Sequence, residues 1–236
     1  MITLRLNKKN SYMKRLIVIL TILVSTIVVA QKPIEKSIGE FTHLKVYDLI
    51  DLELIKSDND RIVITGKNNK DVLVNNKNGT LKIKMKLEEA FDGNKTKVQL
   101  YYTALDVIDV NEGAKVTSKE TIEQFEIDLN AQEGGKIIVN LDVKYANIRS
   151  VTGATIETTG SAKHQDISIY TGGIYDGEDL KTEFTDVSIR IAGKAYVRAK
   201  TLVNAKIRAG GDIFIYGKPE RVDESRALGG RIKRMD

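Results

Sequence analysis

Few side chains in this sequence could perform acid–base or metal chemistry. The chain has 236 residues, no cysteine and only two histidines, His43 and His164, which lie about 120 residues apart. The lack of cysteine excludes disulfides, thiolate metal sites and a cysteine nucleophile. Neither histidine has the neighbouring hydroxyl and carboxylate pattern of a triad or a zinc site, so we interpret both as solvent-facing, His164 in a polar connection between strands. We therefore predict no catalytic residue and no cofactor.

One acidic cluster could bind a cation. The segment Asp176-Gly177-Glu178-Asp179 brings three carboxylates together, and carboxylate oxygens are the ligands that calcium prefers. The spacing does not match a calcium-binding loop. We interpret the segment as a solvated acidic turn and predict no metal site.

The second half of the chain contains an internal repeat. Six short alternating runs open with an isoleucine or a valine at intervals of 19 to 21 residues, at Ile108, Ile127, Ile148, Ile167, Val187 and Ile207. Glycines follow the runs at Gly113, Gly134, Gly153, Gly172-Gly173, Gly193 and Gly210-Gly211. Period-two alternation with recurring glycines and no helical pattern predicts an all-β fold, a right-handed β-helix or solenoid with coils of about 20 residues. A β-sandwich remains the alternative, because half of this period falls in the 8 to 12 residue spacing typical of sandwiches.

Further short strands precede the repeat. Apolar residues alternate in short runs from Phe41 to Leu100, and turn-forming clusters separate these runs, so we assign them to the same domain. Asn78-Gly79 predicts a hairpin turn between two of them. At the other end, Gly217-Lys218-Pro219 predicts the last coil, because proline cannot donate a backbone hydrogen bond to another strand.

The repeat defines one candidate binding face. If the isoleucine column points inward, the next residue of each coil points outward. This predicts an outward column of Asp128, Arg149, Ser168, Ser188 and Arg208, with Asn130, Tyr170 and Arg190 beside it. Arginine forks bind carboxylates or sulfates, and a tyrosine ring can stack on a sugar. Our candidate ligand-binding residues are therefore Arg149, Tyr170, Arg190 and Arg208, with an acidic polysaccharide as ligand; the alternative is a solvated polar wall.

The first 30 residues have the pattern of an export signal. Lys14-Arg15 precede a mostly apolar run from Leu16 to Val29, which ends in the small-residue site Val28-Val29-Ala30. This run is shorter than the roughly 20 residues needed to span a bilayer, so we predict cleavage after Ala30 and no transmembrane segment afterwards. Met13 is a second candidate start.

The leader also explains the formal net charge of +5. It holds five basic residues and no acidic one, so the remaining residues are neutral overall and we expect no nucleic-acid partner. The predicted organisation is a signal peptide at 1–30, a linker at 31–40, one β-solenoid domain at 41–222 and a C-terminal tail at 223–236.

Several segments together resemble a known family. They are residues 41–46 (FTHLKV), 48–54 (DLIDLEL), 78–83 (NGTLKI), 210–219 (GGDIFIYGKP) and 229–232 (GGRI). In this order, over residues 41–232, they resemble the putative auto-transporter adhesin, head GIN domain family, a group of exported β-helical proteins typical of Bacteroidetes. The resemblance implies no catalytic residues. Asp48-Leu49 stands where the family often has glycine.

These observations favour an exported, non-enzymatic β-solenoid that acts as an adhesin or envelope-surface binding protein. We expect its partners to be polysaccharides or envelope proteins, and its location to be the periplasm, the cell surface or the medium. An open end of the solenoid could pair with a second copy. The alternatives are a polysaccharide lyase or hydrolase on a β-helix, and a periplasmic scaffold or sensory partner.

Overall fold

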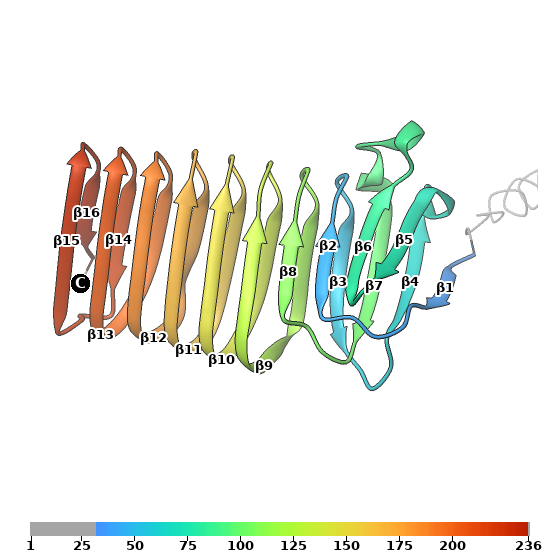
Figure 1. The fold of residues 1–236 in the computed structure, drawn as a ribbon, viewed down its shortest axis with the longest axis horizontal. Helices are drawn as coiled ribbons and strands as arrows, with labels where there is room; N and C mark the ends of the chain where they lie inside the picture. The colour runs from blue at the N-terminus through green and yellow to red at the C-terminus, as the bar shows by residue number, and fades with distance from the viewer. Residues whose placement is uncertain (1–31, 236) are drawn as a thin grey trace, which may run out of the picture. The chain divides into compact units, whose positions relative to one another are not determined.

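The computed structural model describes residues 32–235, and the expected signal peptide lies outside these residues. Residues 33–236 form one compact unit. Its strands wind into a β-solenoid of about seven turns with coils of about 19 residues (Figure 1), as the repeat predicted, and not into a β-sandwich. No helix in the described part of the chain is long and apolar enough to cross a bilayer.

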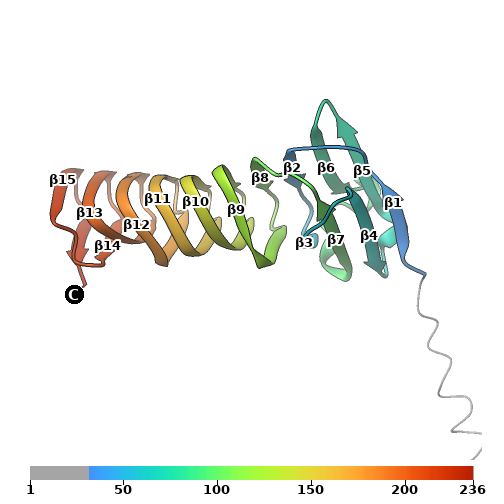
Figure 2. The same ribbon diagram turned by 90° about the horizontal axis from the view of Figure 1, so that it is seen from below.

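Each coil is flat and contributes to two layers, which Figure 2 shows from the edge. Five long strands, β9–β13, run along the first layer, bend at a corner and continue along the second layer. Their pairing is parallel throughout. They are β9 (Lys115–Ala131), β10 (Lys136–Val151), β11 (Thr155–Tyr170), β12 (Ile174–Ile191) and β13 (Lys194–Ala209).

The short strands before the repeat extend both layers toward the N-terminal end. In the first layer the order is β1-β4-β7-β3-β9, and in the second layer β5, β6, β2 and β8 lead to β9. Strands β4 and β5 pair antiparallel to their neighbours, which changes the sheet pattern at this end. The bounds are β1 (Ile34–Ser37), β2 (His43–Val46), β3 (Asp51–Lys56), β4 (Arg61–Gly66), β5 (Val72–Lys77), β6 (Thr80–Met85), β7 (Thr96–Tyr102) and β8 (Val107–Val110).

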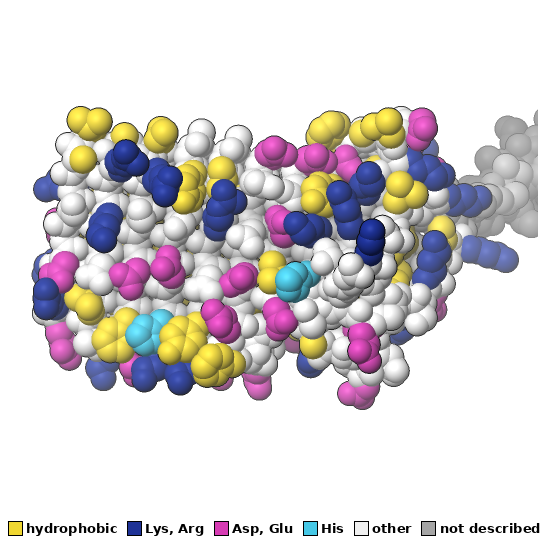
Figure 3. All heavy atoms as spheres, viewed as in Figure 1, with side chains coloured by type: hydrophobic (Ala, Val, Ile, Leu, Met, Phe, Trp, Pro, Cys, Tyr) yellow, Lys and Arg dark blue, Asp and Glu magenta, His cyan; other side chains and the backbone are white. Residues whose placement is uncertain are grey.

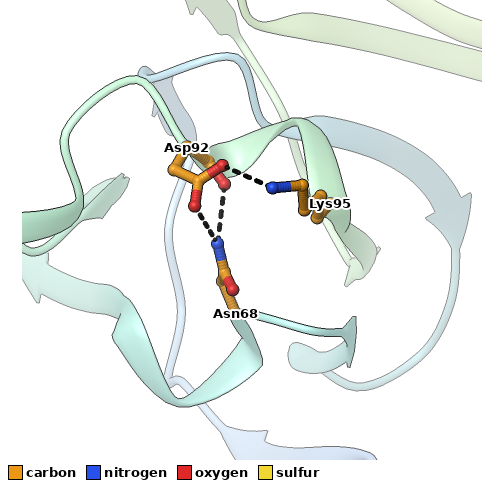
Figure 4. A network of polar contacts seen from close by, with 3 residues as sticks. All are labelled: Asn68, Asp92 and Lys95. Atoms are coloured by element: carbon orange, nitrogen blue, oxygen red, sulfur yellow. Dashed lines mark hydrogen bonds and ion pairs between the residues drawn. The ribbon is translucent and has the colours of Figure 1, made fainter.

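Three single-turn 3₁₀ helices lie in the layer-to-layer connections of this N-terminal part: η1 (Asn69–Asp71), η2 (Leu87–Glu89) and η3 (Gly93–Lys95). Asn68 donates hydrogen bonds from its side-chain amide to the Asp92 carbonyl at 3.0 Å and to the Asp92 carboxylate at 2.7 Å (Figure 4). Lys95 pairs with the same carboxylate at 3.4 Å. These contacts join the β4–β5 connection to the β6–β7 connection.

Left-handed turns reverse the chain once per coil at the end opposite the corner. In Thr152-Gly153 the φ angles are 49° and 71°, and the Ala154 amide donates to the Val151 carbonyl at 3.1 Å. Glycine accommodates this conformation without strain, which explains the recurring glycines. Asp48-Leu49 forms the same kind of turn without glycine, with φ of 59° and 60°.

The interior is mostly apolar, and among its buried polar side chains one connected network stands out. Tyr175 is fully buried, donates to Gln165 Oε1 at 2.8 Å and lies 2.8 Å from Thr158 Oγ1. Gln165 in turn donates to Thr185 at 2.8 Å, and the Thr185 hydroxyl lies 2.9 Å from that of Thr182. Each of these buried groups therefore has a partner, as burial requires.

The C-terminal end differs from our expectation. We expected the solenoid to stop at Gly217-Lys218-Pro219 and a tail to follow, but strands β15 (Arg221–Leu228) and β16 (Arg231–Arg234) pair with β13 and β14 (Asp212–Tyr216). Proline marks only the bend between two strands. The prediction of a linker at residues 31–40 is also wrong, because this segment contains strand β1, which pairs with β4.

The last coil has charged residues at inward register positions. Glu224 pairs with Ala205 and Arg226 with Ile207, whose side chains are buried in the preceding coil. Inward-pointing charges oppose edge-to-edge association of strands. This coil therefore ends the apolar column.

Candidate ligand-binding face

The predicted inward and outward positions are confirmed, but the predicted register is partly wrong. Ile148, Ile167 and Val187 are true neighbours. Ile127 instead lies beside Ala146, and Ile207 beside Ile189. Spacing alone misplaced Ile127 and Ile207 by two residues, because the coils vary in length and irregularities interrupt the pairing of β9 with β10 and of β12 with β13.

The outward columns shift accordingly. Arg149 lies between Asn130 and Ser168, and the column continues through Ser188 to Lys206. Asp128 and Arg208 belong to neighbouring columns. The corrected column still presents polar and basic side chains on one face of the second layer.

Three of the four candidate residues come together on this face. The ring of Tyr170 lies next to two guanidinium groups, with 5.3 Å from its centroid to Arg149 Cζ and 4.8 Å to Arg190 Cζ. The two arginines come from β10 and β12, which pair with opposite edges of β11, so they approach the ring from its two sides. Cation–π attraction therefore holds both guanidinium groups beside the ring.

This geometry changes the expected role of the tyrosine. A ring that lies between two guanidinium groups does not offer its faces to a sugar, so Tyr170 positions the arginines. Arg208 follows Ile207, which pairs with Ile189, and so lies beside Arg190. Arg149, Arg190 and Arg208 are exposed, and in residues 32–235 none of them forms an ion pair with a carboxylate. Figure 3 shows basic side chains over this part of the solenoid.

An acidic and amide column borders the basic side chains. Asn147 donates to Asp128 and Asn204 donates to Asp186, both at 2.8 Å. Asp166 stands between these pairs and directly beside Asp186. Burial, and secondly the charge of Asp186, raise the pKa of Asp166.

A row of four aromatic rings, the last three of them stacked face to face, follows the corner of the solenoid. Phe125, Tyr145, His164 and Phe184 lie in successive coils, with centroid distances of 5.4, 5.2 and 4.7 Å. Figure 3 shows such a row of hydrophobic and histidine side chains along one border of the face. Our interpretation of His164 as part of a polar connection is wrong, because residue 164 lies inside β11 with its ring between Tyr145 and Phe184.

Sequence reasoning missed this row because two successive residues point outward at the corner. Lys144 and Tyr145 break the alternation, as do Lys163 and His164. The signal was present: a charged residue precedes a ring at 144–145, 163–164 and 183–184. A strict period-two pattern conceals such a corner.

The acidic segment at Asp176 lies in an irregularity of β12 where the pairing with β13 is interrupted. No group of three or more potential metal ligands occurs in the part of the chain that the structure describes. The predicted turn is therefore a strand irregularity with exposed Asp176 and Asp179.

Comparisons with known proteins agree with this architecture. The sequence model of the family described as "putative auto-transporter adhesin, head GIN domain" matches residues 40–219. A putative adhesin from Bacteroides fragilis superposes with a TM-score of 0.79 at 19% identity, over 87% of this chain and 98% of that one. A putative adhesin from Parabacteroides merdae gives 0.69 at 18% identity, over 87% and 96%. A putative lipid binding protein from Parabacteroides distasonis gives 0.70 at 16%, over 87% and 96%. A comparison with curated proteins gave no match.

Proposed function

Because the chain belongs to the putative auto-transporter adhesin, head GIN domain family, we propose that it is an exported, non-enzymatic adhesion module of the cell envelope. Its ligand is an acidic polysaccharide, which binds the face around Arg149, Tyr170 and Arg190. The expected signal peptide and the family both support a location outside the cytoplasm.

The observation that carries this proposal is the pair of guanidinium groups at Tyr170. Both are exposed, both are held beside the ring, and neither pairs with a carboxylate of the described residues. A guanidinium group binds a carboxylate or a sulfate through two parallel hydrogen bonds, and fixing it beforehand reduces the entropy lost on binding. Arg208 and Lys206 extend the same basic surface by one coil.

The test measures retention of the purified protein on polygalacturonate, on heparin and on neutral dextran, together with the release of shortened products. We expect retention on the two acidic polymers, no retention on dextran and no shortened products. Shortened products would contradict the non-enzymatic assignment. Anionic lipid vesicles form a fourth arm, because one structural relative is described as a putative lipid binding protein.

The triple variant Arg149→Gln, Arg190→Gln, Arg208→Gln tests the face itself. The matched control is Lys67→Gln, Lys77→Gln, Lys84→Gln, which removes the same charge from exposed residues of the N-terminal part that form no ion pair within the part of the chain that the structure describes. We expect the arginine variant to lose retention and the control to keep it. Equal retention of both variants would refute the assignment of this face.

A further inference from the structure

A groove crosses four coils at the corner of the solenoid, on the far side of the stacked rings from the arginine face. Its volume is about 590 Å³, and its lining comes from β10, β11, β12 and β13 and from Gly217 after β14. The groove crosses the strands, so it runs along the solenoid axis. A ligand that lies in it would contact one coil after another.

The pairing register explains why a groove forms here. Small side chains occupy one position in successive coils, and larger polar side chains flank this position on both sides. The floor is the register column Val143, Ala162, Thr182 and Ala199. One wall contains Ser161, Lys181 and Arg198, and the other contains Lys163, Glu183 and Lys200.

The groove carries an excess of positive charge. Lys163, Lys181 and Lys200 are exposed, and in residues 32–235 none of them forms an ion pair. Arg198 is held in place, since its Nε donates to the Glu178 carbonyl at 2.6 Å. Two carboxylates, Asp142 and Glu183, also line the groove, so the four cations outnumber the anions. A low-dielectric floor and unpaired cations together favour an anionic ligand.

The stacked rings beside the groove are a weaker candidate. Tyr145, His164 and Phe184 cover one another's faces at 4.7 to 5.2 Å, so they present edges to a ligand. The groove, by contrast, places a cation on each of three successive coils, with Lys163 and Lys200 on one wall and Lys181 on the opposite wall. Neighbouring parallel strands lie ~4.8 Å apart, so each step along the groove brings one cation to one wall or the other.

We propose that this groove binds a single extended chain of an acidic polysaccharide, aligned with the solenoid axis. A linear polymer with a carboxylate on each unit matches a channel whose two walls together present one cation per coil over three successive coils. The inference deepens the proposed function, because it assumes the same ligand class, but it assigns a second subsite that shares no residue with the arginine face.

The experiment compares binding of oligogalacturonates of increasing length, by calorimetry, to the full-length protein and its variants. For Lys163→Gln, Lys181→Gln, Lys200→Gln we expect the Kd to rise about tenfold, since each exposed ion pair contributes modestly. The control Lys67→Gln, Lys77→Gln, Lys84→Gln should change the Kd less than about twofold. Glu183→Gln should tighten binding, because it removes a carboxylate from the wall.

Length and salt dependence give two further readouts. Affinity should rise with oligomer length until the groove is filled. It should fall when NaCl increases from ~0.1 to ~1 M, because the screening length drops from ~10 to ~3 Å. Circular dichroism spectra and melting curves show whether each variant is folded.

The outcomes separate the two proposals. If the wild type binds and only the arginine-face variant loses affinity, this subsite is refuted and the proposed function stands. An equal loss in the lysine variant and its control would also refute the subsite, because it would show a response to net charge alone. Preference for anionic vesicles over oligogalacturonate would assign the groove to lipid and overturn the polysaccharide ligand. Absence of any wild-type binding to acidic polymers would overturn the proposed function itself.

Discussion

The buried hydroxyl of Tyr175 should make a large contribution to stability. Tyr175→Phe keeps the ring and its packing but removes the bond to Gln165 Oε1 and the partner of Thr158 Oγ1. Gln165 and Thr158 are each only 2% exposed, so water cannot replace the lost partner. Leaving a buried polar group without a hydrogen-bond partner costs about 1–3 kcal/mol. We expect Tyr175→Phe to lower the free energy of unfolding by about 3 kcal/mol in total. For a unit of this size that corresponds to a decrease in Tm of roughly 6–12 °C.

The assay is equilibrium unfolding in urea, followed by far-UV circular dichroism, with calorimetry for Tm. Tyr145→Phe is the matched control, because the Tyr145 ring is half-buried and its hydroxyl makes no hydrogen bond within residues 32–235. We expect the control to change the free energy of unfolding by less than about 0.5 kcal/mol. Thr158→Val completes a double-mutant cycle. The free energy of unfolding should fall less in the double variant than the sum of its decreases in the two single variants.

The same residue gives a pH dependence with a defined sign. Burial raises the pKa of Tyr175 well above the ordinary value of 10.0. Above about pH 10 the unfolded chain therefore loses this proton while the folded chain keeps it, and stability falls as pH rises. Phenylalanine cannot titrate, so the gap between wild type and Tyr175→Phe should narrow above pH 10. A loss below about 1 kcal/mol at neutral pH, or full additivity in the cycle, would refute the role of the network.

Three other perturbations test separate parts of the fold. Gly160→Ala should destabilise by at least about 2 kcal/mol more than Gly153→Ala in urea unfolding, because both glycines have positive φ but only at Gly160 would a Cβ lie 2.2 Å from a backbone carbonyl oxygen. Burial, and then the charge of the neighbouring Asp48, raise the pKa of Glu112. The folded state therefore loses stability as pH rises through the pKa of Glu112 and this carboxyl becomes charged. Glu112→Gln should raise Tm at pH 7 but not at pH 3, which a series of calorimetric melts at different pH values would show. Glu224→Val with Arg226→Ile should produce concentration-dependent association in light scattering, and a monomer at all concentrations would contradict the capping role of these charges.

Sequence periodicity predicted the architecture because one physical constraint repeats in every coil. Each coil must bury alternate side chains and reverse direction at a left-handed turn, so isoleucine and glycine recur in phase. Turn formation at Asp48-Leu49 shows that glycine is the preferred residue there and not an absolute requirement. The strands before the repeat were predictable for the same reason.

The register and the site were less predictable. Ile127 and Ile148 both point inward, and only the hydrogen-bonded pairing shows that Leu129 and not Ile127 lies beside Ile148. A two-residue shift keeps every side chain on its face but moves it to another column. The contact of Arg149 and Arg190 with Tyr170 rests on the register of β10, β11 and β12, which the spacing predicted correctly. The groove depends on a corner that the alternation does not reveal.

Because the coils are flat and repeat, the length of the solenoid is set by the number of coils. Corresponding residues of β10 and β11 are 19 positions apart, and those of β11 and β12 are 20 apart in their second-layer halves. Insertion or deletion of one such segment would lengthen or shorten the solenoid by a single step of ~4.8 Å and leave both ends intact. The number of coils thus sets the length of each face of the solenoid in steps of ~4.8 Å.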